Sequence, residues 1–331
     1  MPEPPPTTLD LTHLDDPAFD KLYREQIEPQ LVVRETERRA DVSTFWWRLI
    51  PGLAGVLSLG IFLWSIEWNE FALFGGFIGA IGVASFAYLP LSTLSDQIKR
   101  RMLVTISDTI GCTYRENGFQ PVAGDRMGAL GLIPRYDRSH FEDWFAGQRF
   151  KCGFDLYEAH LEQRQETKNG TTWITVFRGQ LLRVSYPKPF SGVTVVRRDR
   201  GLFNFLDHFG SKLQRVGLED EKFERDFEVY ASDQVEARDL VHPVFMERLL
   251  ALESAYDGKR IRCAFQEGDL LLAVEGRDRF ELGSMFAPLA DPARVRSVVN
   301  DIAEVVRLID AMLTTERAPL VALGNKDVPV E

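Results

Sequence analysis

Two long apolar segments in the first third of the chain limit what it can fold into. They run from about residue 49 to 66 and from 71 to 91, and only Glu67 to Glu70 separate them. Neither segment contains a lysine, arginine, aspartate or glutamate. A helix of about 20 apolar residues matches the roughly 30 Å hydrocarbon core of a bilayer. The sequence therefore predicts a transmembrane helical hairpin over residues 45–91.

The residues that flank the two spans predict an orientation. Basic residues stand outside the hairpin at both ends, at Arg34, Arg38, Arg39, Arg48, Lys99, Arg100 and Arg101. Because flanks rich in lysine and arginine stay on the cytoplasmic side, we expect both ends of the chain in the cytoplasm. Indole rings prefer the membrane–water interface, which predicts four interfacial anchors: Trp46, Trp47, Trp64 and Trp68. The alternative, two core helices of a large soluble protein, explains neither the tryptophans nor the basic flanks.

The second span is rich in small residues. Gly75 and Gly79 share one helical face, and so do Gly76, Ala80 and Ala84. In lipid, small residues let helix backbones approach closely. Two interpretations stay open: the second span packs on the first, or copies of the hairpin form a homo-oligomer. An ion or proton pathway normally leaves ionisable residues inside the spans, so a transporter or channel is not predicted.

Composition and motifs argue against several other classes of protein. The chain has 39 basic and 49 acidic residues, a net charge of −10, whereas nucleic-acid binding needs a concentrated basic surface. Its three cysteines are odd in number and far apart, which favours buried thiols over a disulfide or a metal site. The five histidines are scattered, and no phosphate-binding loop or nucleophile elbow occurs. We therefore expect no catalytic residue, no metal and no cofactor.

The pattern along the chain predicts a membrane-anchored α+β protein. Hairpin signals without regular β-α-β alternation favour a mixed, mostly antiparallel sheet with packing helices. Around the hairpin we expect a disordered N-terminus (1–16), a cytosolic amphipathic helical segment (17–44), a helical stalk (92–110), a cytosolic α+β domain (111–315) and a flexible tail (316–331).

Several elements of the α+β domain can be predicted individually. Asn169-Gly170 predicts a tight turn between two strands, since both residues tolerate positive φ. Residues 223–230 predict a strand, and residues 235–256 a helix that breaks near Pro243. After Asp291-Pro292, apolar residues at three- and four-residue steps predict an amphipathic helix that packs on the sheet, with a coiled-coil partner as the alternative.

The densest group of polar residues in this domain is Glu219, Asp220, Asp233 and Arg238. Clustered carboxylates can bind a hard cation or another polar ligand, so these four are the candidate ligand-binding residues. Their spacing differs from that of a calcium loop, however. The structural alternative is a half-exposed strand followed by a helix with Asp233 as its N-cap.

The motifs around these residues carry a resemblance to a known family. They are Phe223 to Asp233, Val235-Glu236-Ala237-Arg238, Pro243 to Leu249, Phe177-Arg178-Gly179, Phe190-Ser191-Gly192, and Glu28-Pro29-Gln30-Leu31 ahead of a two-span hairpin. As a set they resemble the bacterial family of domain of unknown function 3137. The resemblance implies a bacterial inner-membrane protein with a cytosolic domain, and it brings no reaction, cofactor or catalytic residue.

Together these observations predict a membrane-tethered interaction or regulatory module. Its expected partners are the lipid bilayer, a protein of unknown identity and, through the hairpin, a second copy of the chain. The alternative is a domain or enzyme that acts on a lipid or a membrane-bound substrate through the cluster at Glu219, Asp220, Asp233 and Arg238.

Overall fold

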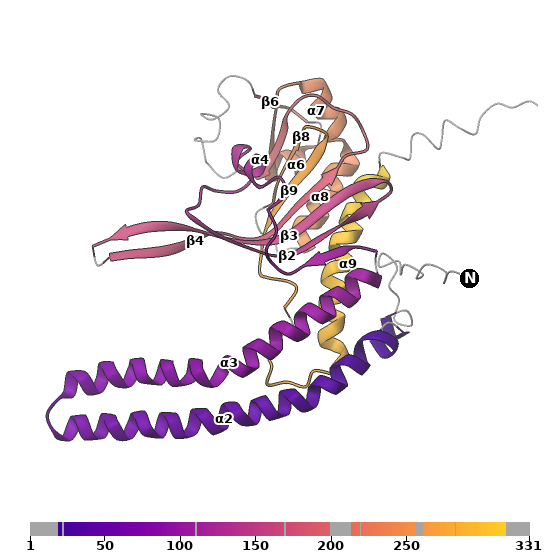
Figure 1. Ribbon diagram of the computed structural model, residues 1–331. Coiled ribbons are helices and arrows are strands. Elements are labelled where there is room, and N and C mark those ends of the chain that lie inside the picture. Colours follow the sequence, from indigo (N-terminus) through magenta and orange to yellow (C-terminus); the bar gives the residue numbers. More distant parts are fainter. Residues whose placement is uncertain are drawn as a thin grey trace, which may run out of the picture. The chain divides into compact units, whose positions relative to one another are not determined.

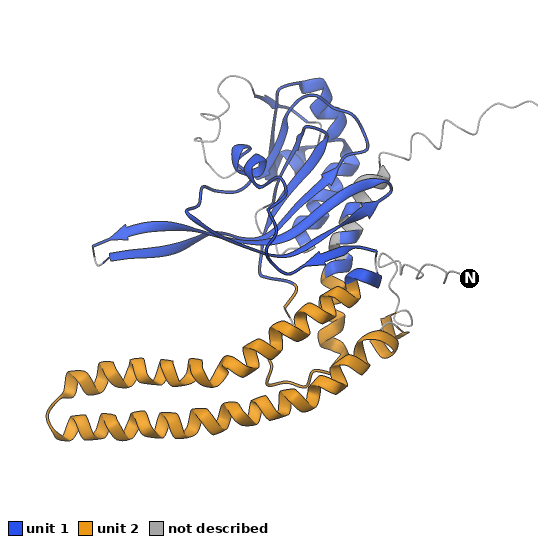
Figure 2. Cartoon of the chain, viewed as in Figure 1, with its two compact units in different colours: residues 1–12, 107–279, 302–331 blue, residues 13–106, 280–301 orange. Residues whose placement is uncertain are grey.

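The computed structural model describes residues 19–315 except residues 22, 110, 169, 199–212, 219, 256–260 and 282. The expected disordered N-terminus, the expected tail and Asn169 of the expected turn lie outside the described residues. The chain divides into two compact units (Figure 2). Unit 1 comprises residues 1–12, 107–279 and 302–331, and unit 2 comprises residues 13–106 and 280–301.

Unit 2 is built on two long antiparallel helices, α2 (Glu28–Ser65) and α3 (Asn69–Thr109), which Figure 1 shows side by side. A turn of π-helix, η2 (Tyr23–Ile27), precedes α2, and Pro29 lies in the first turn of α2. This is where the missing N–H of proline costs no helical hydrogen bond. The last residues of α3 belong to unit 1.

Both helices are long and apolar enough to cross a membrane, by length and composition. Their apolar side chains are not covered by the rest of the described protein. In the most apolar 18-residue window of α2 no residue is buried, and in that of α3 only 11% are. A helix in the core of a soluble protein is instead covered by its neighbours.

Unit 1 contains an antiparallel sheet, which confirms the predicted α+β class. In the part of the chain that the structure describes, nine strands pair in the order β1-β2-β3-β4-β9-β8-β5-β7-β6. Their bounds are β1 Thr113–Arg115, β2 Arg138–Arg149, β3 Cys152–Thr167, β4 Gly170–Ser185, β5 Thr194–Arg198, β6 Gln214–Val216, β7 Phe227–Ala231, β8 Ile261–Gln266 and β9 Asp269–Glu275. The helices are α4 Gly124–Ala129, α6 Glu221–Asp226, α7 Gln234–Leu240, α8 Pro243–Ala255 and α9 Pro292–Thr315, which continues from unit 2.

Both faces of the central strands are buried. On one face Tyr157, Leu181 and Leu271 belong to an apolar core that includes Met127 of α4. On the other face Phe265 of β8 packs against Phe245 of α8, with ring centroids 5.3 Å apart. Residues alternate between the two faces along each strand, so a polar residue in the middle of these strands has little access to water.

Residues 223–230 differ from the predicted single strand. Residues Glu221–Asp226 form helix α6, and only the residues from Phe227 onward form a strand. The Asp220 side chain accepts a hydrogen bond from the Phe223 backbone N–H (2.9 Å), which caps the helix. Phe223 and Phe227 stack with ring centroids 4.9 Å apart. Their four-residue spacing is a helical period, which the alternating pattern of the charged residues obscured.

The family motifs around Gly192 and Glu236 meet in unit 1. The Glu236 carboxylate, on α7, accepts hydrogen bonds from the backbone N–H groups of Ser191 (2.8 Å) and Gly192 (2.7 Å). A Cβ atom at Gly192 would lie 2.4 Å from Glu236 Oε2, so a larger residue would displace the Glu236 carboxylate from these hydrogen bonds. Ser232 Oγ accepts a further hydrogen bond from the Val193 N–H (2.9 Å). These contacts fix the loop that leads into β5.

We predict that Glu236→Ala destabilises the full chain by about 1–2 kcal/mol, because a carboxylate that accepts two backbone hydrogen bonds contributes about that much. Thermal unfolding in detergent measures the change. The matched control is Glu247→Ala, an exposed glutamate on α8. Equal melting temperatures for the two variants would contradict the proposed role of Glu236.

Candidate functional site

Three acidic side chains converge in unit 1 at one end of the sheet. Glu142 of β2 and Glu158 of β3 are direct cross-strand partners, and Gln180 of β4 is the next residue in the same row. Asp278 comes from the segment that follows β9. One carboxylate oxygen from each of Glu142, Glu158 and Asp278 lies within 4.8 Å of the others.

The segment after β9 crosses the middle of β4 and β3 and holds this row in place. Its Gly276 N–H donates to the Arg178 carbonyl (2.9 Å), and its Arg279 N–H donates to Glu158 Oε1 (2.8 Å). Gln180 Nε2 donates both to Glu158 Oε1 (2.8 Å) and to the Arg277 carbonyl (3.1 Å). The backbone thus brings Asp278 beside residues that lie about a hundred positions earlier in the chain.

The electrostatic environment differs between the members of the cluster. Glu158 and Gln180 are each 2% exposed. The pKa of Glu158 is raised to about 8, chiefly by burial and also by the charges of Asp143 and Asp278, while the hydrogen bonds from Arg279 and Gln180 oppose the rise. Asp278 pairs with the guanidinium of Arg178, whose Nε lies 2.9 Å from Asp278 Oδ1. An uncompensated buried carboxylate is costly, so this site favours a bound proton or another positive charge.

A bulge lies next to the cluster. The pairing of β2 with β3 shifts register between Glu142 and Phe145, and Asp143 there has φ of 54°. The buried Asp143 accepts a hydrogen bond from the Tyr114 hydroxyl (2.6 Å). Burial, and then the Asp143 charge, raises the pKa of Tyr114. Bulges are frequent beside functional sites because they redirect side chains.

Sequence reasoning missed this cluster. Glu142 and Asp278 belong to no recognisable sequence motif. The one available signal was Glu158, which alternates in phase with the apolar Phe154 and Leu156 and is therefore predicted on a buried face. The contact with Asp278 depends on the pairing of β4 with β9.

The predicted ligand-binding residues have other contacts. Glu219 lies outside the described residues. Asp220 caps α6, and Asp233 caps α7 by accepting from the N–H groups of Val235 (2.8 Å) and Glu236 (3.0 Å). Arg238 donates to the Gly217 carbonyl (3.3 Å). In the described part of the chain these contacts favour structural roles for the three residues.

The small residues of the hairpin divide into two groups in unit 2. A Cβ atom at Gly79 would lie 3.2 Å from Val56 of α2, so Gly79 faces the first span. Cβ atoms at Gly75 and Gly76 would have no neighbour within 4 Å in the described protein. Gly76 and Ala80 line an apolar groove of about 560 Å³ between the helices, whereas Ala84 is exposed.

All four predicted interfacial tryptophans are exposed: Trp46 48%, Trp47 77%, Trp64 56% and Trp68 58%. At the base of the hairpin, Phe286 joins this aromatic group from the segment before α9. Its ring centroid lies 5.1 Å from that of Phe45 and 6.5 Å from that of Trp46. Tyr88 of α3 lies 6.4 Å from Phe45. No pattern in the sequence predicts this contribution of Phe286.

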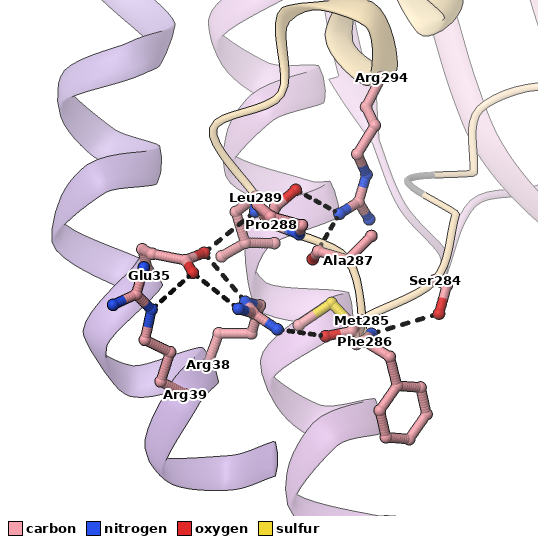
Figure 3. Close-up of polar contacts among 10 residues, drawn as sticks. All are labelled: Glu35, Arg38, Arg39, Ser284, Met285, Phe286, Ala287, Pro288, Leu289 and Arg294. Atoms are coloured by element: carbon pink, nitrogen blue, oxygen red, sulfur yellow. Dashed lines mark hydrogen bonds and ion pairs between the residues drawn. The ribbon is translucent and has the colours of Figure 1, made fainter.

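An ion-pair network fixes the Phe286 segment to α2 (Figure 3). Arg38 is only 7% exposed, and its guanidinium donates to both oxygens of Glu35 at 2.7 and 2.9 Å and to the Met285 carbonyl at 3.0 Å. Glu35 also accepts from the Leu289 N–H (3.0 Å) and from Arg39 (3.0 Å). The Arg38 hydrogen bond is the main reason that the pKa of Glu35 falls to about 2.

These features define an α+β protein with an antiparallel sheet and a pair of long apolar helices. Residues 175–313 match the family described as "Protein of unknown function (DUF3137)". The family resemblance of the sequence motifs is thereby confirmed. The matched segment contains Arg178, Gln180 and Asp278 of the cluster, while Glu142 and Glu158 precede it.

No curated protein matches the chain. A solved structure entitled "crystal structure of the mycobacterial trehalose monomycolate transport factor A, TtfA" is similar at 10% sequence identity, with a TM-score of 0.34. The similarity covers 64% of this chain and 96% of that chain.

We predict that Glu35→Gln lowers the melting temperature of the full chain in detergent at pH 7. The folded-state pKa of Glu35 is lowered, so its stabilisation is complete above the unfolded pKa of about 4.3. It is lost as the pH falls toward 2. The deficit of the variant should therefore be constant between pH 6 and 7 and shrink below about pH 4.

The matched control for Glu35→Gln is Glu37→Gln, because the Glu37 side chain is 48% exposed and pairs with Arg34 on the same helix. It should change the melting temperature little at any pH. A deficit for Glu35→Gln that stays the same down to pH 3 would contradict the role of its charge.

Proposed function

We propose that the helical pair α2 and α3 is a transmembrane hairpin that anchors unit 1 to a membrane. The observation that supports this proposal most is the lack of protein cover on its apolar residues. Leu57 and Phe77, for example, are 67% and 68% exposed. An apolar surface of this extent is rare on a soluble monomer and is stable in the hydrocarbon of a bilayer.

The aromatic residues at the base of the hairpin support an interface at that level. Trp46, Tyr88 and Phe286 lie where the apolar spans end, and Arg48 lies with its guanidinium 4.9 Å from the Phe86 ring centroid. Aromatic rings and arginine are the side chains that proteins place at the headgroup level. In this proposal the Glu35–Arg38 network holds Phe286 against the same interface.

The basic residues outside the spans favour a cytoplasmic position for both ends of the chain and for unit 1. The family resemblance favours the inner membrane of a bacterium. Unit 1 then acts as an interaction or regulatory module held at the membrane by α3 and α9, which both continue into it.

The surface that we propose for partner contact is the arm formed by the ends of β3 and β4, which Figure 1 shows extending beyond the rest of the sheet. Trp173 and Ile174 on this arm are each 41% exposed. The Arg138 guanidinium lies 4.7 Å from the Trp173 ring centroid. Exposed tryptophan flanked by arginine is typical of protein interfaces.

The alternative site at Asp220, Asp233 and Arg238 has no comparable support, because those side chains cap helices and bind backbone.

Two arginines in the middle of the spans should release the protein from the membrane. We predict that Leu57→Arg with Ile81→Arg shifts the full chain from the carbonate-resistant membrane fraction to the soluble or aggregated fraction. Each arginine at a span centre costs about 2.5–3.5 kcal/mol on insertion scales.

The control is Val33→Arg with Val235→Arg, which changes two aliphatic residues of similar exposure outside the spans and should leave the protein in the membrane. Reporter fusions after Glu331 and within the Glu67–Glu70 turn test the orientation. A wild-type chain that carbonate extracts, or a periplasmic reporter after Glu331, would overturn the proposal.

A photo-crosslinking amino acid at Trp173 should form adducts with a partner protein in intact membranes, because that ring is exposed at the arm. The same amino acid at Phe150, 38% exposed at the opposite turn of β3, is the control. An adduct with a second copy of the chain would identify the partner as a homo-oligomer. Equal adduct yields at the two positions, or none at Trp173, would reject the arm as the contact surface.

A further inference from the structure

The row of Glu142, Glu158 and Gln180 has oxygen atoms that the described protein leaves without hydrogen bonds. Glu158 Oε2 and Gln180 Oε1 are buried and accept no hydrogen bond from any residue that the structure describes. Native proteins rarely bury such atoms without a water, a proton or an ion. Since both residues are 2% exposed, bulk water does not compensate for the missing bonds.

The orientation of the Gln180 amide is determined by its neighbours. Its Nε2 lies 2.8 Å from Glu158 Oε1 and 3.1 Å from the Arg277 carbonyl, and both of these atoms are acceptors. Turning the amide over would place its oxygen against two other oxygens. The unpaired oxygen is therefore Oε1.

The distances in the cluster fit a single ion. Calcium binds oxygen at about 2.3–2.6 Å, so ligands on opposite sides of it are about 4.6–5.2 Å apart, whereas magnesium requires about 4.0–4.2 Å. The carboxylate oxygens of Glu142, Glu158 and Asp278 lie within 4.8 Å of one another. Three oxygens this close together can contact one ion, and calcium accepts an irregular set of oxygen ligands more readily than magnesium does.

The charges also match a divalent cation. The three carboxylates and the paired Arg178 leave two negative charges when all are ionised. Arg178 approaches Asp278 from the solvent side, since its side chain is 50% exposed and that of Asp278 only 16%. A carboxylate oxygen has two lone pairs, so Asp278 can accept from Arg178 and also bind an ion.

We propose that Glu142, Glu158 and Asp278, together with the amide oxygen of Gln180, bind one divalent cation with the size and oxygen preference of calcium. Nothing in the proposed membrane function requires this site. The cation joins β2, β3 and β4 to the segment after β9, so its binding stabilises that segment on the sheet.

Isothermal titration calorimetry on the full chain in detergent, treated with EDTA and dialysed, tests the site. Calcium chloride and magnesium chloride are titrated separately. We expect saturable binding of one calcium ion per chain, a higher melting temperature with calcium, and at least about tenfold weaker binding of magnesium, whose size fits less well.

Four substitutions distinguish the site from adventitious binding. Glu142→Gln and Asp278→Asn each remove a charged ligand and should weaken calcium binding by at least about tenfold. Glu166→Gln, on an 82% exposed side chain of the same strand as Glu158, should leave it unchanged. Arg178→Gln also breaks the ion pair to Asp278 but removes a positive charge, so it should keep or strengthen calcium binding.

The Arg178→Gln variant breaks the ion pair without removing a ligand, so it separates these two effects. Glu142 is partly exposed, so Glu142→Gln removes a ligand without burying a new polar group. Absence of saturable calcium binding by the wild type would mean that water or a shared proton fills the site, which overturns the proposal. Calcium binding that survives both Glu142→Gln and Asp278→Asn lies elsewhere on the chain and overturns it equally.

Discussion

Close backbone approach between α2 and α3 is the constraint on which the rest of unit 2 depends. A Cβ atom at Gly52 would lie 2.5 Å from Val83, and one at Gly79 would lie 3.2 Å from Val56. Glycine at these two positions allows the helices to pack along a narrow seam, and the remaining apolar side chains then face outward. Such a surface is stable in the hydrocarbon of a bilayer, because a helix already pairs its own backbone polar groups.

In unit 1, by contrast, the sheet buries polar groups in an apolar layer. Glu158 and Gln180 lie in a row between apolar neighbours such as Leu156 and Leu182, and each is held by hydrogen bonds to the other and to the segment after β9. A polar network of this kind is favourable only when every member is satisfied. The two unpaired oxygens are therefore the most informative atoms in the unit, because the fold retains them at a cost in free energy.

The parts of the fold that depend on local periodicity could be predicted from the sequence. The two apolar helices, the break at Pro243 and the buried stripe of α9 all follow from apolar spacing or from turn residues. Helix α6 could not be predicted in the same way, because Glu224, Asp226 and Glu228 also alternate as in a strand. The cap from Asp220 and the stacking of Phe223 on Phe227 decide between the two periods.

The acidic cluster is non-local: Asp278 is more than a hundred residues from Glu158, and only the strand order β3-β4-β9 brings them together.

Gly179 connects the family motif Phe177-Arg178-Gly179 to this cluster. It has φ of 151°, and a Cβ atom there would lie 2.0 Å from the Val274 carbonyl oxygen of β9. Any larger residue would push β9 away from β4, and with it the segment that carries Asp278. The glycine separates Arg178, which pairs with Asp278, from Gln180, which bonds Glu158. The motif is thus explained by geometry, because Arg178 pairs with Asp278 and Gly179 keeps β9 close enough to β4 to supply the third carboxylate.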